Sequence, residues 1–236
     1  TNQVIVVNDG STDDTFTILE GYKNIIAISY PKNKGKGWAL RTRFKQVTLR
    51  GYEYAITIDS DGQHFPEDLP LFLEKLKSSG PSLIIGARNM NQSSVPGKSS
   101  FGHKFSNFWF WVETGIKSPD TQSGYRLYPI GLMRDMKFFT RKFEFEIEVI
   151  VRAAWKGIKV ESVPVQVYYA PSGVRVSHFR PFQDFTRISL LNTVLVLITL
   201  FYINPRNFIR ALFNKSTYSH LKQELFQREE PAFITA

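Results

Sequence analysis

Short apolar runs alternate with amphipathic stretches through the first third of the chain. The runs at 4–7, 25–29, 54–58 and 83–86 have the length and β-branched content of buried strands. Helical patterns fill the segments between them: 11–22, 37–51 and 67–79. This alternation predicts an α/β fold with a mostly parallel sheet and helices on both of its faces. Ligands of such sheets bind beyond the carboxyl ends of the strands.

The middle of the chain is less regular. Residues 89–102 are polar and rich in Ser and Gly, which predicts a mobile loop, a candidate lid. Pro164 lacks a backbone N–H, which argues that the strand expected around it lies at the edge of a sheet. The other elements expected here are a helix over 105–115, a polar loop over 120–128, a helix over 143–155 and a strand over 160–169.

The chain changes character after Ser172. Between Gly173 and Lys215 it has six Arg or Lys residues and one acid, Asp184, and residues 188–203 carry no charge. A helix of that length spans roughly 24 Å, less than the ~30 Å hydrocarbon core of a bilayer. We therefore predict a domain over 1–172 and a membrane-associated basic and apolar segment over 173–236. A buried core helix or a dimer contact remains the alternative.

The beginning of the chain suggests a larger sheet. Residue 1 is Thr, and the first apolar run is already in progress at Val4. Because a central strand seldom opens a domain, we expect a strand N-terminal to Thr1.

Composition narrows the chemistry. None of the 236 residues is Cys, which excludes disulfides, thiolate metal sites and Cys nucleophiles. The formal net charge of +9 indicates an anionic partner, such as a nucleotide or a phospholipid surface. The basic residues are scattered, so a nucleic-acid binder is the weaker interpretation.

Two carboxylates, Asp59 and Asp61, follow the third predicted strand. On a turn they can converge on a hard cation such as Mg²⁺ or Mn²⁺, which would bridge them to a diphosphate. An EF-hand loop would need Glu at its twelfth position, where this chain has Pro70. A haloacid-dehalogenase-type phosphatase is disfavoured because Gln63 and His64 follow the pair, with no later pair of adjacent aspartates.

Three further motifs are candidates for ligand contact. Asp9 ends the first predicted strand, where an acid can accept from a ribose hydroxyl or a base edge. Residues 33–37, Asn-Lys-Gly-Lys-Gly, lack the spacing of a P-loop but can hold a nucleotide near a helix N-terminus. In the segment 120–126, Arg126 is suited to a phosphate and Asp120 to a base or an acceptor contact.

Taken in order, these segments resemble family 2 glycosyltransferases of the GT-A fold. The similarity is greatest to the dolichyl-phosphate mannose synthase-like branch, whose members glycosylate polyprenyl phosphates. It covers residues 1 to about 170 and rests on the strings at 6–13, 33–37, 59–64, 86–88, 120–126 and 157–165.

The resemblance implies inverting transfer of a sugar from a nucleotide-diphospho-sugar to a lipid-linked acceptor at the cytoplasmic face of a membrane. The family pattern assigns roles as follows: Asp9, Gly10, Ser11, Lys34, Gly35 and Asp59 to the nucleotide, Asp59, Asp61 and Gln63 to Mg²⁺ or Mn²⁺, and Arg88, Arg126 and Asp120 to phosphate contact and catalysis.

Two alternatives remain. If the acceptor is a hydroxyl of a glycolipid or polysaccharide precursor, a base is required, and Asp120 is the candidate. The branch often has arginines where this chain has Lys98, His103 and Lys104, which keeps that alternative open. A degenerate binding module is disfavoured by the intact acid pair.

Overall fold

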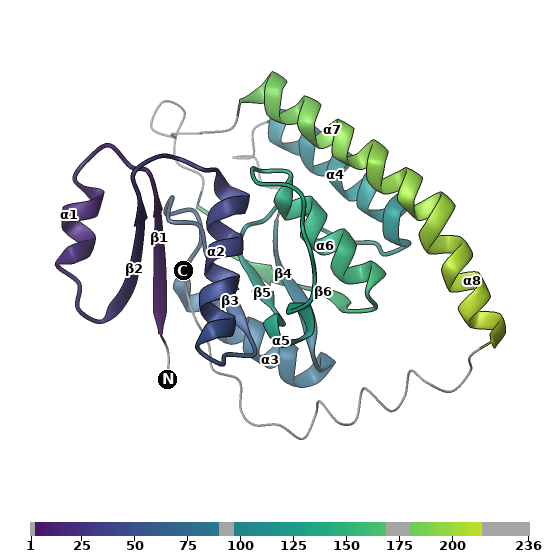
Figure 1. Ribbon diagram of the computed structural model, residues 1–236, viewed down its shortest axis with the longest axis horizontal. Coiled ribbons are helices and arrows are strands. Elements are labelled where there is room, and N and C mark those ends of the chain that lie inside the picture. The colour runs from purple at the N-terminus through teal and green to yellow at the C-terminus, as the bar shows by residue number, and fades with distance from the viewer. Residues whose placement is uncertain (1–2, 90–96, 169–179, 214–236) are drawn as a thin grey trace.

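The computed structural model describes residues 3–89, 97–168 and 180–213 (Figure 1). Its strands are β1 (Val4–Asp9), β2 (Ile25–Tyr30), β3 (Ala55–Thr57), β4 (Ser82–Arg88), β5 (Arg126–Tyr128) and β6 (Lys159–Val165). Its helices are α1 (Thr15–Glu20), α2 (Lys36–Leu49), α3 (Leu69–Ser79), α4 (Gly97–Thr114), α5 (Ile130–Met133), α6 (Phe145–Trp155), α7 (Pro181–Ile198) and α8 (Asn204–Phe213). A 3₁₀ turn, Pro66–Asp68, precedes α3, and a π-helical turn, Thr199–Ile203, joins α7 to α8.

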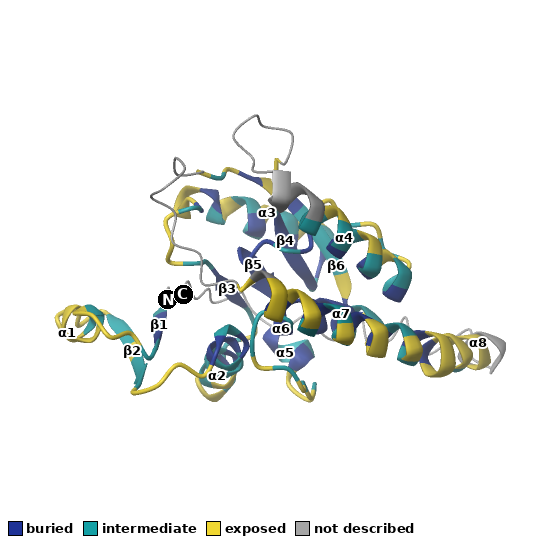
Figure 2. Ribbon diagram, turned by 90° about the horizontal axis from the view of Figure 1, so that it is seen from above, coloured by how far each residue is buried: buried dark blue, intermediate teal, exposed yellow. Residues whose placement is uncertain are grey.

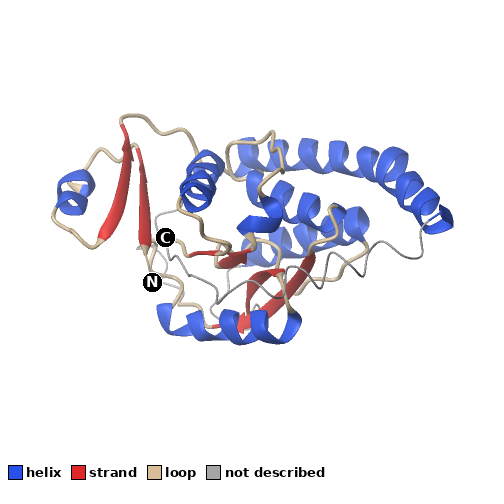
Figure 3. Cartoon of the chain, turned by 60° about the horizontal axis from the view of Figure 1, so that its bottom comes forward, coloured by secondary structure: helices blue, strands red, loops and turns tan. Residues whose placement is uncertain are grey.

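The strands form two hydrogen-bonded groups (Figure 3). β1 and β2 pair in parallel, and the other four lie in the order β3-β5-β4-β6. β4 and β6 are parallel, whereas β5 runs antiparallel to both β3 and β4. The predicted α/β fold is confirmed, and the edge position of β6 agrees with Pro164. The antiparallel β5 was expected to be loop.

Helices cover both faces of the four-stranded sheet (Figure 2). Along β4, Leu83 and Ile85 belong to a core shared with α2, α5 and α6, while Ile84 belongs to a core shared with α3. Successive strand residues point to opposite faces, so a strand buried on both sides needs a continuous apolar run. This is why 83–86 is recognisable from sequence.

α4 is longer than expected. The sequence predicted a loop through residue 102, but α4 begins at Gly97, so that prediction was wrong for 97–102. Ser and Gly disfavour a helix only weakly, and burial of the aromatic face of α4, including Phe110, outweighs that preference. Residues 90–96 of the predicted lid lie outside the described residues.

The C-terminal helix is also longer than the uncharged run 188–203. α7, the π-helical turn and α8 continue from Pro181 to Phe213, because Pro fits a first helical turn and Arg187 and Arg206 do not interrupt a helix. Among the described residues, one helix, Phe182–Ile209, is long and apolar enough to cross a membrane by length and composition. Only 22% of its most apolar window is buried, which disfavours a core helix.

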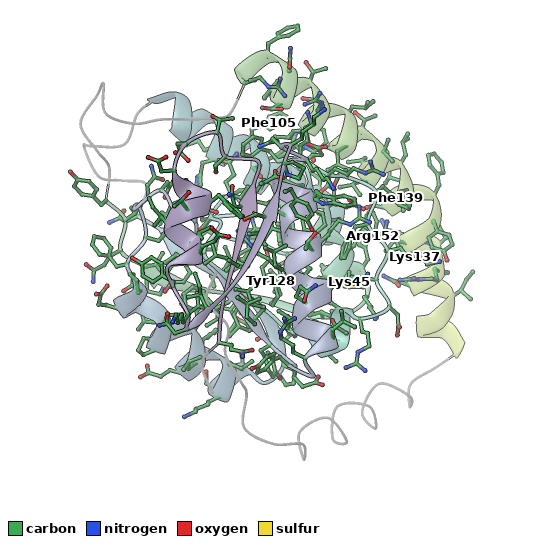
Figure 4. All side chains as sticks on the ribbon, turned by 60° about the vertical axis from the view of Figure 1, so that its left-hand side comes forward. Lys45, Phe105, Tyr128, Lys137, Phe139 and Arg152 are labelled. Carbon is green, nitrogen blue, oxygen red and sulfur yellow. The ribbon has the colours of Figure 1, made fainter. Side chains whose placement is uncertain are left out.

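The start of α6 is tied to the segment before it. Glu148 accepts hydrogen bonds from the backbone N–H groups of Phe139 and Thr140, at 2.9 Å for each. The Arg152 guanidinium lies 4.8 Å from the centre of the Phe139 ring, and Figure 4 shows both side chains. The Glu148 contacts fix the first turn of α6, and the Arg152 contact holds its last turn to the same segment.

Three helices meet at Glu113. Its backbone carbonyl accepts from Trp155 Nε1 of α6 at 2.9 Å and from Thr199 Oγ1 at 3.1 Å. Its side chain is 1% exposed, and neither carboxyl oxygen has a hydrogen-bond partner among the described residues. Burial raises the pKa of Glu113 to about 8, so the carboxyl group is protonated in the folded protein at neutral pH.

Arg126 lies wholly inside the fold at the first position of β5. Its guanidinium donates to the carbonyl oxygens of Ser123 at 2.6 Å, Glu146 at 2.7 Å and Thr121 at 2.9 Å. One side chain therefore joins the 121–126 loop to the first turn of α6.

Glu113→Gln should reduce the pH dependence of stability. Below the usual carboxyl pKa of 4.5 the group is protonated in both folded and unfolded chains. As the pH rises toward 8 only the unfolded chain loses this proton, so stability falls by up to about 1.4 kcal/mol per pH unit. Urea unfolding at pH 5 to 8 gives the free energy of unfolding at each pH. This free energy should fall less steeply with rising pH for the variant than for wild type or for the exposed control Glu20→Gln. Parallel profiles would contradict this account.

Arg126→Lys should destabilise the protein, because one ammonium group cannot reach three carbonyls in different directions. Each buried carbonyl that loses its donor costs about 1–3 kcal/mol in the free energy of unfolding. Urea titration is the measurement, and the control is Arg134→Lys at an exposed position, expected within about 0.5 kcal/mol of wild type. If the variant were as stable as wild type but bound the expected nucleotide-diphospho-sugar more weakly, that result would instead support direct contact of Arg126 with phosphate.

Candidate active site

The acid pair lies just beyond the end of β3. Asp61 is exposed, and one of its oxygens accepts from the backbone N–H of Gln63 at 3.0 Å, a turn closed by Gly62 with φ of 71°. Asp59 lies against Gly124, where a Cβ atom would come within 2.3 Å of a carboxylate oxygen. Carboxylate and amide oxygens are the ligands that Mg²⁺ and Mn²⁺ prefer, so the chemistry of Asp59, Asp61 and Gln63 fits such an ion.

A lysine bridges this pair to α6. Lys36 Nζ lies 2.9 Å from Asp59 Oδ2 and 3.1 Å from Glu146 Oε2. Burial alone would lower the pKa of Lys36, but the two carboxylates outweigh it and hold that pKa above its usual value. Burial would likewise raise the pKa of Asp59, yet Lys36 holds it below its usual range. Lys36 and Asp59 are therefore both charged at neutral pH.

Asp9, at the end of β1, positions the 33–37 loop. Its two oxygens accept from the backbone N–H groups of Lys34 at 2.8 Å and Gly35 at 2.7 Å. Gly10 has φ of 78°, and a Cβ there would lie 2.3 Å from Asn33 N. Ser11 donates its backbone N–H to Asn8. The structure thus gathers Asp9, Gly10, Lys34 and Gly35, while their contact with a nucleotide stays a prediction.

Arg88 and Asp120 form a two-pronged ion pair at the end of β4. Arg88 Nε lies 2.7 Å from Asp120 Oδ2, and Nη2 lies 3.1 Å from Oδ1. Gln122 N–H also donates to Oδ1, and His103 Nε2 is 3.7 Å from it. Asp120 is 0% exposed. Burial raises the pKa of Asp120, but bonding to Arg88 outweighs this and leaves it below its usual value.

His64 is a buried histidine that closely follows the acid pair in the sequence. It is 8% exposed, its ring centre lies 5.3 Å from that of Tyr125, and its Nδ1 has no hydrogen-bond partner among the described residues. Burial lowers the pKa of His64 and the charge of Arg88 adds to that shift, whereas the charges of Asp59 and Asp120 oppose it. The acid pair and the Arg88–Asp120 pair thus act on one imidazole ring.

Arg126 donates to backbone carbonyls, including that of Glu146, rather than to the carboxylates of this site. Its guanidinium is enclosed by backbone carbonyls, a position that favours a role in holding the 121–126 loop. The predicted contact with phosphate remains untested.

Sequence reasoning left Lys36, Glu146 and His64 without roles. The signals for Lys36 and His64 were present, since both belong to motifs already recognised. Glu146 lies among the alternating acids at 144, 146 and 148, whose spacing does not say which one faces the site.

Two relatives in sequence and one solved structure show which known proteins this chain is similar to. A UDP-N-acetylglucosamine–dolichyl-phosphate N-acetylglucosaminyltransferase of Methanococcus voltae is 25% identical, with 71% of this chain and 75% of that protein aligned. An undecaprenyl-phosphate mannosyltransferase of Micrococcus luteus is 26% identical over 70% and 71% of the two chains. The crystal structure of glucosyl-3-phosphoglycerate synthase from Mycobacterium tuberculosis with Mn²⁺, UDP and phosphoglyceric acid shares the fold, with a TM-score of 0.56, 21% identity, and 86% and 68% coverage.

The family assignment rests on more than these pairs. The sequence profile of the family described as glycosyl transferase family 2 matches residues 1–136, more than half of the chain. The resemblance found in the sequence is therefore confirmed: the chain belongs to glycosyl transferase family 2, with a GT-A fold, and is a glycosyltransferase that uses a nucleotide sugar.

Proposed function

We propose that this protein transfers a sugar from a nucleotide-diphospho-sugar to a polyprenyl phosphate, with inversion at the anomeric carbon. The observation that carries this proposal is the state of Asp120. Its oxygens accept from Arg88 and from Gln122 N–H, it is 0% exposed, and its pKa is lowered. Such a carboxylate is a poor base for a hydroxyl acceptor.

A phosphate acceptor needs no base at this position. One of its ionised oxygens attacks the anomeric carbon, the bond from that carbon to the donor's diphosphate oxygen breaks, and the nucleoside diphosphate leaves with the electron pair. The relatives from Methanococcus voltae and Micrococcus luteus act, by their names, on dolichyl phosphate and undecaprenyl phosphate. The Arg88 guanidinium, oriented by Asp120, is suited to the anionic acceptor or donor.

Donor binding is assigned to the edge formed by the ends of β1 and β3. We assign the nucleotide to Asp9, Gly10, Ser11, Lys34, Gly35 and Asp59, where backbone and side chains converge. Asp59, Asp61 and Gln63 would hold Mg²⁺ or Mn²⁺, which when bound would stabilise the negative charge of the departing diphosphate. The Mn²⁺ and UDP of the mycobacterial neighbour support a divalent ion by likeness of fold.

The helix Phe182–Ile209 is proposed to hold the protein at the cytoplasmic face of a membrane. Its outer surface exposes large apolar side chains: Phe182, Leu190, Leu197, Leu200, Phe201, Tyr202, Phe208 and Ile209. Neighbouring α4 adds Phe108 and Trp111. Exposed apolar surface next to Arg180, Arg187 and Arg206 suits the boundary between acyl chains and anionic headgroups.

The linkage formed in the product tests the acceptor. With a lipid extract that contains both polyprenyl phosphates and hydroxyl-bearing glycolipids, Mn²⁺ and a panel of labelled UDP- and GDP-sugars, we expect an organic-phase product whose label is released by mild acid, because a sugar phosphodiester is acid-labile. Asp61→Ala should lose at least 100-fold in rate, consistent with the charge stabilisation lost with a metal ligand. A lipid label that survives mild acid would mean a glycosidic bond to a hydroxyl and would overturn the proposed acceptor.

Membrane association can be tested on the outer surface of the C-terminal helix. The double variant Leu190→Glu/Phe201→Glu should bind anionic phospholipid vesicles at least tenfold more weakly, since each buried apolar side chain contributes about 1.5–3 kcal/mol. Leu49→Glu, an equally exposed position at the end of α2, is the matched control and should bind as wild type does. Co-flotation of the double variant at the wild-type level would contradict a membrane contact through this surface.

A further inference from the structure

We propose that the Lys36 ammonium group stays paired with the Asp59 carboxylate until a metal ion and a nucleotide bind together. Lys36 would in this way couple the binding of the metal ion to that of the nucleotide. The inference rests on the proposed function, because it assumes the metal and donor sites assigned above. It goes further by assigning Lys36 a positioning role that makes metal binding without nucleotide weak.

The geometry places Lys36 between two acids from different elements. Lys36 is the first residue of α2, Asp59 follows β3, and Glu146 lies in the first turn of α6. The 2.9 Å and 3.1 Å contacts use two of the three hydrogens of the ammonium group. No contact within the described residues uses the third, which could meet a diphosphate oxygen without loss of the bond to Glu146.

Two glycines make this placement possible. Gly35 adopts φ of 101°, and a Cβ there would lie 2.8 Å from the carbonyl oxygen of Arg141. A Cβ at Gly37 would lie 2.4 Å from Phe145 Cβ. Only residues without a Cβ let α2 start against the start of α6, which is where Lys36 meets Glu146.

Electrostatics gives the ammonium group its effect on a metal ion. A divalent ion that used the Asp59 carboxylate would lie within a few ångströms of a second positive charge, and the two would repel strongly. A nucleoside diphosphate brings negative charge that can pair with Lys36 as the ion binds. Metal and nucleotide should therefore strengthen each other's binding by the same factor, since such coupling is reciprocal.

The neighbouring lysines are oriented differently. Lys34 Nζ lies 4.4 Å from the centre of the Tyr30 ring and 5.0 Å from that of Trp38. Lys45, on the same helix as Lys36, is exposed. Lys45→Met is therefore a matched control that removes one positive charge from α2 away from the acids.

The test is a Mn²⁺ titration followed by the electron paramagnetic resonance signal of free Mn²⁺, with no acceptor present. Without nucleotide, Lys36→Met should bind Mn²⁺ at least tenfold more tightly than wild type, and Lys36→Arg and Lys45→Met should match wild type. The gain in Mn²⁺ affinity on adding UDP or GDP should shrink in Lys36→Met by the same factor. Lys36→Gln, which is uncharged and keeps hydrogen bonding, replaces the methionine variant if that one does not fold.

The outcomes separate this proposal from the proposed function. If wild type binds Mn²⁺ with nucleotide but neither uncharged variant gains affinity without it, Lys36 is not the competing cation and only this inference is overturned. If Asp61→Ala binds Mn²⁺ as tightly as wild type when nucleotide is present, the assigned metal site itself is wrong, and this inference is overturned with it.

Discussion

The active-site edge depends on how the backbone of residues 34–38 is held between two parts of the molecule. Within the described residues, the β1–β2 pair and the four-stranded sheet share no strand-to-strand hydrogen bonds. Asp9 binds this backbone from β1 through two N–H groups, and Trp38 N–H donates to the carbonyl of Arg141 at 2.9 Å on the other side. The glycines at 35 and 37 let the chain pass without a clash. One short segment thus sets the distance between the end of β1 and the end of β3.

The opposite side of the site is fixed by two guanidinium groups, that of the buried Arg126 and that of the partly buried Arg88. Arg126 bonds three carbonyls and holds the loop in which Gly124 makes room for Asp59. Arg88, at the end of β4, donates hydrogen bonds to both carboxylate oxygens of Asp120. Groups fixed in this way need little reorganisation when negative charge develops on a departing diphosphate. Fixed charges contribute most to catalysis when they already point at the position where such charge develops.

The sequence located the acids well and their partners poorly, for a physical reason. Asp9 and Asp59 are recognisable because parallel strands end at a common edge, so position along the chain translates into position in space. The contact of Lys36 with Glu146 joins residues 110 positions apart and depends on how α2 packs on α6. β5 has only three residues, too few to show a recognisable strand pattern in the sequence. The length of the last helix was underestimated because the uncharged run between Arg187 and Pro205 was taken as the whole helix. A long basic side chain lets a helix continue past it, and Pro205 lies in the first turn of α8, where proline is tolerated.

The arrangement of α4, α6 and α7 indicates how a lipid acceptor would reach the proposed site. α4 comes close to Asp120 through His103, and two residues later Phe105 packs on Phe185 of α7 at 5.1 Å between ring centres. The N-terminal ends of α4 and α7 therefore lie nearest the Arg88–Asp120 pair. From there both helices lead away along α6, which spans about 14 Å between Glu146 beside Lys36 and Trp155 beside Glu113. An acceptor whose phosphate meets Arg88 would then have its apolar chain directed toward the exposed aromatic surface of α4 and α7, so that the helices proposed to contact the membrane would also orient the acceptor.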